Sequence, residues 1–371
     1  MKPRLLSVLH YSPPMHGASK VGDFIKNSEK LNSEFECYYI KIKSSSSIDE
    51  IGKVSFKKIY LVLELFFRVL WALIIFRPNI IYFTASTRGV AFYRDVILST
   101  LWKLYSKLTT VDIFYHYHTK GINKFVSSSS KALTLTRFFL NDINLVILSP
   151  MLEDDFRRVK TYKNVYYLPN GVETDIDEKA FTKIVEKRYS NLDTLNVLYL
   201  SNMIKSKGYF KVLQLASKTK DSQVHYHFAG GWQKDEDKEE FFQFIKDENL
   251  EDVVTFHGFV GGDEKQELFS NAHFFIFPTR YENEAFPLSI LEAFSYGLPV
   301  LVTDEGSIPF IVDEKSGVIL KDDNDLFEGF QKLKEAFINK ETAAYCRQCY
   351  FDKYSLEQFE RNLVALLKME K

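Results

Sequence analysis

The stretch FFIFPTRYENEAFPLSILEAFSYGLPV, residues 274–300, decides the fold of this chain. An apolar, aromatic run comes first, a polar loop with carboxylates follows, and apolar residues then recur at helical spacing over 288–296. Pro287 suits the first helical position, because its missing N–H would have no partner there, and Gly297 is a helix stop. The pattern therefore predicts a strand, a loop and a helix, with the next strand at 300–303.

Two acids flank the predicted start of this helix. In an open α/β sheet, a loop that follows a strand lies at the edge where ligands collect, and the N–H groups of a helix start favour an anion. Glu284 precedes the helix and Glu292 lies inside it, so we expect them to face different parts of one elongated ligand. Ionised carboxylates only accept hydrogen bonds, which suits sugar hydroxyls. A nucleotide-sugar, with phosphate in the middle and hydroxyls at both ends, has the matching shape.

The spacing of these two acids resembles the Glu-x7-Glu motif of the retaining GT-B glycosyltransferases of family GT4. The resemblance implies that Glu284 contacts the transferred sugar and that Glu292 binds the ribose hydroxyls. It also implies that backbone N–H groups in the segment Phe286, Pro287 and Leu288 hold the distal phosphate. Taken alone, two glutamates would more simply be a solvated loop acid and an exposed helix acid, but the surrounding pattern favours the functional interpretation.

A second loop of the same half carries the expected cation. The segment 201–208 resembles the family loop in which an arginine and a lysine neutralise the leaving diphosphate, and Lys207 matches the lysine. Asn202 stands where the arginine is usual, so one cation of that clamp is missing. Lys205 could compensate, although a solvated loop lysine is the simpler interpretation of that residue.

Three further donor contacts follow from the resemblance. Gly258 and Phe259 lie in a loop that resembles the one holding the nucleobase through backbone groups, and Gly306 is expected near the phosphates. The family needs no catalytic metal and no cofactor, so we expect none here.

The first half of the chain carries the acceptor-side candidates. His16 and Gly17 lie in the loop after the first predicted strand, which resembles the usually glycine-rich loop between donor and acceptor. His118 follows a later strand, and in GT4 relatives such a histidine points into the cleft beside the transferred sugar. Strand alternation is expected to turn His116 to the other face. A hydrogen-bonded histidine at a strand end is the alternative for His118, and Arg88 adds a cation in a loop of small residues.

Two features of the first half bear on a lipid surface. Its basic side chains could suit an anionic headgroup or an acceptor diphosphate, or simply form a solvated helix face: Arg88, Arg94, Lys103 and Lys107. The longest apolar stretch, 59–76, contains Glu64 and Arg68 and so falls short of a clean transmembrane span. We expect a largely buried helix there, with an interfacial helix as the alternative.

The composition sets the limits. A chain of 371 residues is long enough for two domains, and a net charge of −1 gives no nucleic-acid signature. Three cysteines imply no disulfide framework, and the short apolar run after Met1 is no signal peptide. A cytoplasmic protein is therefore expected, with peripheral contact at the inner membrane face as a further possibility.

These observations predict an α/β protein of the GT-B class, with two facing Rossmann-like domains, parallel sheets and an interdomain cleft. An acceptor domain is expected at 1–173 with a C-terminal return helix at 355–371, a linker at 174–194, and a donor domain at 195–354. The predicted function is retaining transfer of a sugar from a UDP- or GDP-sugar to a sugar or lipid-linked glycan acceptor, in surface polysaccharide or glycolipid synthesis. A GT-B sugar-nucleotide epimerase and a non-catalytic nucleotide-sugar-binding protein are the alternatives.

Overall fold

The computed structural model describes residues 2–13, 17–43, 56–220 and 222–369. The chain divides into two compact units, one formed by residues 1–170 with 356–371 and the other by residues 171–355. Each unit is built on a parallel six-stranded sheet, and each is described by itself below.

The sheet of the first unit has the strand order β2-β1-β3-β4-β5-β6, and every neighbouring pair is parallel. Its strands are β1 (Arg4–Leu9), β2 (Glu36–Lys41), β3 (Ile80–Thr84), β4 (Asp112–His116), β5 (Asn144–Ile147) and β6 (Asn164–Tyr167). The central strands read as nearly continuous apolar runs because helices cover both faces of the sheet and leave little of it in water.

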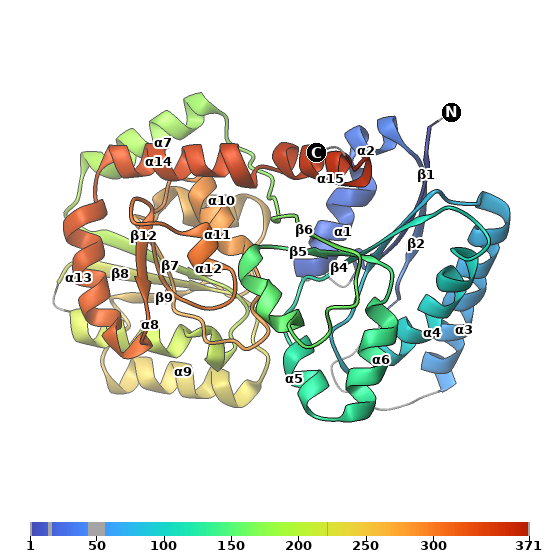
Figure 1. The fold of residues 1–371 in the computed structure, drawn as a ribbon. Helices are drawn as coiled ribbons and strands as arrows, with labels where there is room; N and C mark the ends of the chain where they lie inside the picture. The colour runs from blue at the N-terminus through green and yellow to red at the C-terminus, as the bar shows by residue number, and fades with distance from the viewer. Residues whose placement is uncertain (1, 14–16, 44–55, 221, 370–371) are drawn as a thin grey trace. The chain divides into compact units, whose positions relative to one another are not determined.

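Helices cover the two faces of this sheet separately (Figure 1). One face packs against α1 (Gly17–Asn27), α2 (Glu29–Glu34) and the C-terminal α15 (Leu356–Leu367), whose Phe359 and Leu363 join Leu5 and Phe114 in one core. The other face carries α3 (Phe56–Trp71), the π-helix η2 (Ala72–Phe76), α4 (Gly89–Tyr105), α5 (Ile122–Ser127) and α6 (Ser130–Leu140). A 3-10 helix, η3 (Pro150–Phe156), follows β5. Trp102 and Tyr115 fill the core beneath α4, joined by a 2.7 Å hydrogen bond from Nε1 to the phenol oxygen.

The second unit repeats the plan with the strand order β12-β11-β10-β7-β8-β9, again all parallel. Its strands are β7 (Leu195–Leu200), β8 (Val224–Ala229), β9 (Val254–Phe256), β10 (Phe274–Phe277), β11 (Val300–Thr303) and β12 (Gly317–Leu320). Its helices are α7 (Glu178–Ser190), η4 (Lys205–Lys207), α8 (Tyr209–Thr219), α9 (Asp235–Asp247), α10 (Gly262–Asn271), α11 (Leu288–Ser295), α12 (Ile308–Ile311), η5 (Asp323–Asp325), α13 (Leu326–Phe337), α14 (Lys340–Cys349) and η6 (Tyr350–Tyr354).

The loops that matter for function lie at one edge of the second sheet. Because all its strands are parallel, the loops after β7, β8, β9, β10 and β11 meet at the carboxyl edge. Backbone hydrogen bonds tie them together, from Gly230 N–H to the Gly258 carbonyl at 2.7 Å and from Ser307 N–H to the Ala285 carbonyl at 2.9 Å. The candidate donor residues are thus carried on loops fixed to a rigid sheet.

Two sequence-based expectations differ from this fold. The linker expected at 174–194 is mostly a helix, α7, whose Phe181 and Val185 pack against Ala343 in the second unit. The largely buried helix expected at 59–76 is wrong, because only 22% of that stretch is buried. By length and composition this stretch could also cross a membrane.

Candidate functional site

Lys207 and Glu284 bring the first two loops of the second unit together. Lys207 ends η4 after β7, Glu284 lies in the loop between β10 and α11, and Nζ stands 3.0 Å from Oε2. Glu284 is only 9% exposed. The contact is an ion pair without hydrogen-bond alignment, and in the described part of the chain Oε2 has no hydrogen-bond partner. The carboxylate can therefore accept a hydrogen bond from a ligand hydroxyl beside the lysine.

Two glycines allow the backbones of this site to approach. Gly208 has a φ of +88°, and a Cβ there would lie 2.4 Å from the carbonyl oxygen of Pro278. Gly306 has a φ of +57°, and a Cβ there would lie 2.3 Å from the carbonyl oxygen of Glu284. Any larger residue at either position would be strained and would push the adjoining loop away. Gly306, expected near the phosphates, thus directly supports the backbone of Glu284.

The start of α11 is open to an anion. Pro287 is the N-cap and the helix begins at Leu288, one residue later than the sequence predicts. No side chain caps this helix start and no acid lies in its first turn, all of which falls within the described residues. Phe286 is buried and packs edge-to-face on Tyr354, with the ring centroids 6.0 Å apart. The uncompensated N–H groups and the helix dipole favour a phosphate here.

Glu292 lies on the second turn of α11 and has a partner that the sequence did not reveal. Lys265 of α10 donates from Nζ to Oε2 of Glu292 at 2.7 Å, and Glu292 is only 8% exposed. A carboxylate this buried needs a compensating charge. The two residues come from different helices, so only the packing of α10 beside α11 could have disclosed the pair.

Two buried arginines, also missed from the sequence, hold the other end of α11. Arg188 of α7 donates to the carbonyls of Tyr296 at 3.0 Å and Phe269 at 3.2 Å, at the ends of α11 and α10. Arg347 of α14 donates to the Ser295 carbonyl. Cations at helix C-termini satisfy the last carbonyls and favour the helix dipole. Burial lowers the pKa of Arg188 to about 10, so it stays charged at neutral pH.

The remaining donor candidates lie on the same sheet edge. Asn202 is exposed, and its backbone carbonyl accepts a hydrogen bond from the Ile204 N–H at 2.8 Å. Its side chain is a neutral amide, so this position supplies no cation to the site. Gly258 has a φ of +72° in the loop after β9, and the Phe259 ring beside it is largely exposed. An exposed aromatic ring on this edge offers a flat surface for a planar group.

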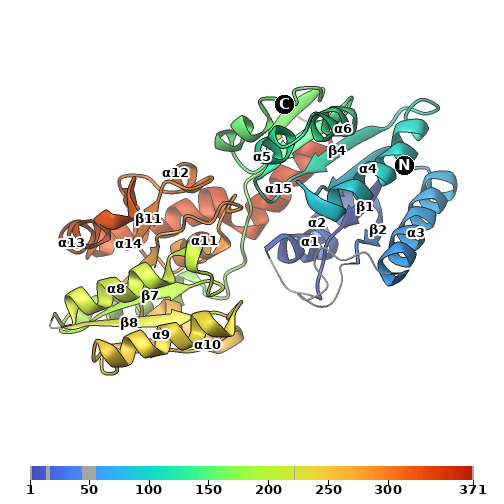
Figure 2. The same cartoon turned by 90° about the horizontal axis from the view of Figure 1, so that it is seen from below.

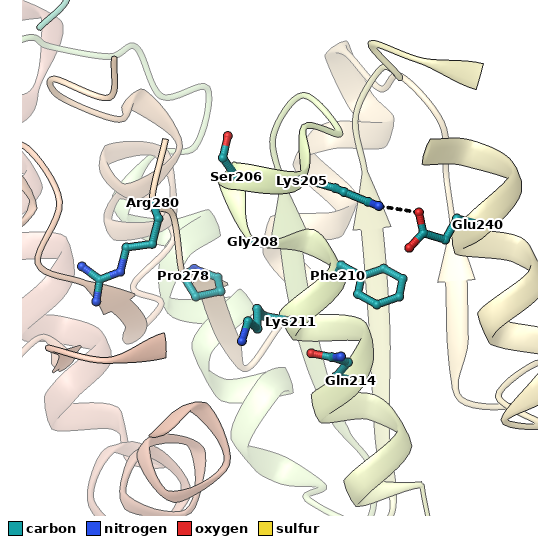
Figure 3. Close-up of a pocket in the computed structure, with 9 residues that line it drawn as sticks. All are labelled: Lys205, Ser206, Gly208, Phe210, Lys211, Gln214, Glu240, Pro278 and Arg280. Carbon is teal, nitrogen blue, oxygen red and sulfur yellow. Dashed lines mark hydrogen bonds and ion pairs between the residues drawn. The ribbon is translucent and has the colours of Figure 1, made fainter. Parts of the chain in front are cut away.

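A pocket of about 270 Å³ lies between the loop that carries Lys207 and the helices α8 and α9 (Figure 3). Lys205 lines it and turns toward α9, where it pairs with Glu240 and approaches Asp237 to 3.9 Å. Lys205 therefore does not compensate for Asn202 at the Glu284 site. Lys207 and Glu284 are not among the residues that line this pocket, and we do not place the donor there.

The histidines of the first unit differ from the expectation in one respect. His116 ends β4 and is buried, with Nδ1 2.5 Å from the Tyr82 phenol oxygen. The rings of His116 and His118 lie 4.0 Å apart, so both are on the same side. The alternation argument was wrong because side chains two residues apart share a face of a strand. Burial and the neighbouring His118 hold the pKa of His116 well below its ordinary value, which keeps it neutral.

The other acceptor-side candidates are placed only in part. His16 lies outside the described residues, and Gly17 begins α1 with open space around its Cα. Arg88 is the exposed N-cap of α4. The expected basic surface is reduced, because Arg94 pairs with buried Asp95 at 2.7 Å and Lys103 donates to the Asn141 carbonyl.

Two α/β units, each built on a parallel six-stranded sheet, have the architecture of the GT-B fold. Residues 181–348, which lie in the second unit, match the family of glycosyl transferases group 1.

Two known proteins resemble parts of the chain. The chain is 26% identical over 302 residues to the sulfoquinovosyl transferase SQD2 of Arabidopsis thaliana, covering 77% of this chain and 55% of that protein. It is 24% identical over 139 residues to the putative colanic acid biosynthesis glycosyltransferase WcaL of Escherichia coli, covering 35% and 33%. The chain thus spans about half or less of the length of these relatives.

Among solved structures, Anabaena HepE in complex with UDP and glucose superposes with a TM-score of 0.69 at 14% identity, covering 99% of each chain. At this identity the likeness establishes the fold and no more.

Proposed function

We propose that this chain is a retaining glycosyltransferase of the GT4 type, which moves a sugar from a nucleotide-sugar to an acceptor hydroxyl. The observation that carries the proposal is the meeting of Lys207 and Glu284, with a 3.0 Å contact, beside the uncapped start of α11. A cation and a helix start suit a diphosphate, and a carboxylate whose Oε2 has no hydrogen-bond partner among the described residues suits a sugar hydroxyl.

Each donor-side residue has a role in this proposal. Lys207 and the backbone N–H groups of Phe286 and Leu288, on either side of Pro287 at the start of α11, stabilise the charge that develops on the leaving diphosphate. Glu284 orients the transferred sugar, Glu292 accepts from the ribose hydroxyls, and Gly258 with Phe259 takes the nucleobase. The acceptor hydroxyl attacks from the face that the leaving group vacates, and its proton passes to the departing phosphate. The work of the protein is positioning and electrostatic stabilisation, which requires neither a metal nor a cofactor.

The acceptor side of the proposal rests on the first unit. His118 with Gly17, His16 and Arg88 would receive a sugar or a lipid-linked glycan at the cytoplasmic side. HepE was solved with UDP and glucose, which supports a UDP-sugar as the first donor to test. The name of WcaL, a putative colanic acid biosynthesis glycosyltransferase, supports a role in surface polysaccharide synthesis, and glycolipid synthesis is the other role we propose.

The test is release of nucleoside diphosphate from UDP-, GDP- and ADP-sugars, with lipid-phosphate acceptors present. We expect one donor to be turned over, and Glu284→Ala, Glu292→Ala and Lys207→Ala each to lower the rate on the order of a hundredfold. Lys205→Ala is the matched control, because Lys205 pairs with Glu240 on α9. Equal losses in both lysine variants would contradict the assigned role of Lys207.

One observation favours a second candidate, a nucleotide-sugar-binding protein without catalysis. Asn202 leaves the diphosphate site with one cation fewer than the family pattern has. Donor binding without any turnover, measured on the same panel, would support this candidate. Conversion of one nucleotide-sugar into another, without nucleotide release, would instead indicate an epimerase.

A further inference from the structure

The helices α3 and α4 of the first unit expose apolar side chains in two long stripes. On α3 the exposed positions recur every three or four residues, and they are Tyr60, Leu63, Phe67, Trp71 and Ile74. On α4 and just beyond it they are Val90, Tyr93, Ile97, Leu104 and Leu108. We call these ten residues the apolar face. Spacing of this kind places the members of each stripe on one side of their helix.

The two stripes belong to one surface. α3 packs against α4, and both cover the same side of the first sheet (Figures 1 and 2). The opposite side of each helix enters the core, through Leu65 and Val69 on α3 and through Phe92 and Trp102 on α4. The apolar face therefore points away from the sheet. Soluble proteins rarely expose so many clustered large apolar residues without a partner.

The residues around the apolar face carry an excess of positive charge, which favours an anionic partner. Residues 56–108 hold only two acids, Glu64 and Asp95. Both are neutralised within the unit, Glu64 by Lys43 at 2.6 Å and Asp95 by Arg94 at 2.7 Å. The same span holds eight basic residues: Lys57, Lys58, Arg68, Arg77, Arg88, Arg94, Lys103 and Lys107. The whole chain has a net charge of −1, so positive charge is concentrated in the span 56–108.

The exposed members of this basic set lie at the ends of the stripes. Arg77 follows η2 and Lys107 follows α4, and both are exposed. Tyr105 donates to the Pro78 carbonyl at 3.3 Å, which places the two helix ends beside each other. An apolar surface bordered by cations, with Tyr60, Trp71 and Tyr93 carrying a polar group on an apolar ring, matches the boundary of an anionic bilayer.

We propose that the apolar face of α3 and α4 docks the protein on an anionic lipid bilayer, with both helices lying in the plane of the interface. The helices rest on the bilayer and do not cross it, because the inner side of α3 is part of the core of the first unit. A second copy of the chain is a poorer occupant, since a two-fold contact would bring the same cations against each other. The inference concerns lipid binding and is independent of the transfer reaction.

The test is co-sedimentation of the full chain with vesicles of phosphatidylcholine, with and without phosphatidylglycerol. We expect binding to the vesicles that contain phosphatidylglycerol and at least about tenfold weaker binding for Leu63→Glu and Phe67→Glu. Leu192→Glu is the matched control, because Leu192 of the second unit is 44% exposed and Leu63 is 50% exposed. The double variant Arg77→Gln with Lys107→Gln is expected to lose most of the preference for phosphatidylglycerol.

A second measurement avoids any question of folding. Brominated lipid in the vesicles should quench the fluorescence of the wild-type chain, and Trp71→Phe should remove most of that quenching, since Trp102 is buried and the half-buried Trp232 belongs to the second unit. The proposal is overturned if the wild type binds no vesicles or if Leu63→Glu binds as well as Leu192→Glu. It is also overturned if, without lipid, the chain sediments as a dimer that Leu63→Glu dissociates, because the face then belongs to a second copy.

Discussion

Lys265 donates to Oε2 of Glu292 at 2.7 Å, joining α10 to α11 across 27 residues of sequence. This pair fixes the direction in which the Glu292 carboxylate points. The lysine also compensates for the burial of that charge. Glu292 therefore meets a ligand already oriented, which lowers the cost of binding.

We predict that Lys265→Met weakens the binding of UDP, or of the nucleoside diphosphate released in the donor screen, by about tenfold. The variant removes the Lys265 hydrogen bond from the Glu292 carboxylate, which is then held less firmly in its direction. Isothermal titration calorimetry would measure the affinity, with Lys238→Met on the exposed side of α9 as control. Unchanged affinity in a variant of unchanged stability would refute the positioning role.

A second prediction concerns Gly306, whose backbone packs against the loop that carries Glu284. We expect Gly306→Ala to lower the free energy of unfolding by about 1–3 kcal/mol, because φ is positive and the new Cβ would meet the Glu284 carbonyl oxygen at 2.3 Å. The displaced carboxylate should also slow turnover. Gly261→Ala is the control, because its Cβ would meet nothing within 4 Å. Equal behaviour of the two variants in urea unfolding and donor turnover would contradict this account.

Much of the second unit could be predicted from its sequence, because the deciding signals are local. The strand, loop and helix around Glu284 and Glu292 follow from apolar periodicity and from Pro287 and Gly297, and the structure has them within one residue. The Glu-x7-Glu spacing is local in sequence, so the two acids can be found without knowledge of any long-range contact. The predicted roles of these residues stay predictions until the donor is tested.

The features that sequence reasoning missed depend on long-range packing, or on which side of a helix faces the sheet. Lys265 and Arg188 act on residues far along the chain, so no local pattern marks them. The stretch 59–76 is apolar on both sides of its helix, and hydropathy cannot tell which side meets the sheet and which meets solvent. The helix α7 has a weak apolar stripe among many charges, and such a pattern predicts a linker.

A third prediction tests the cap on the C-terminal end of α11. We expect Arg188→Met to lower the free energy of unfolding by about 2–4 kcal/mol, because the Tyr296 and Phe269 carbonyls lose their donor inside the protein. Urea denaturation would measure the change. Lys187→Met, on the exposed side of the same helix, should change stability by about 0.5 kcal/mol or less. A loss in Arg188→Met no larger than this would show that the carbonyls find other partners.

A last prediction concerns acid. His273 is buried between strands and helix, where Nδ1 accepts from the Asn196 N–H at 2.9 Å and Nε2 donates to the Arg188 carbonyl at 3.1 Å. Burial lowers the pKa of His273 to about 4 from its ordinary 6.5. Protonation would turn the acceptor nitrogen into a donor facing another donor, so the folded state resists it.

Between pH 4 and pH 6.5, His273 is protonated in the unfolded chain and neutral in the folded chain. The contribution of His273 is thus fully present above about pH 6.5 and is lost as the pH falls toward 4, by an amount on the order of 3 kcal/mol. We expect His273→Asn to be less stable at pH 8 but to lose less stability between pH 7 and pH 5 than the wild type. Urea unfolding across that range measures the slope, and NMR titration of the imidazole should give a pKa near 4. Identical slopes in both proteins, or an imidazole that titrates near its ordinary pKa, would show that this histidine is accessible to protons in the folded state.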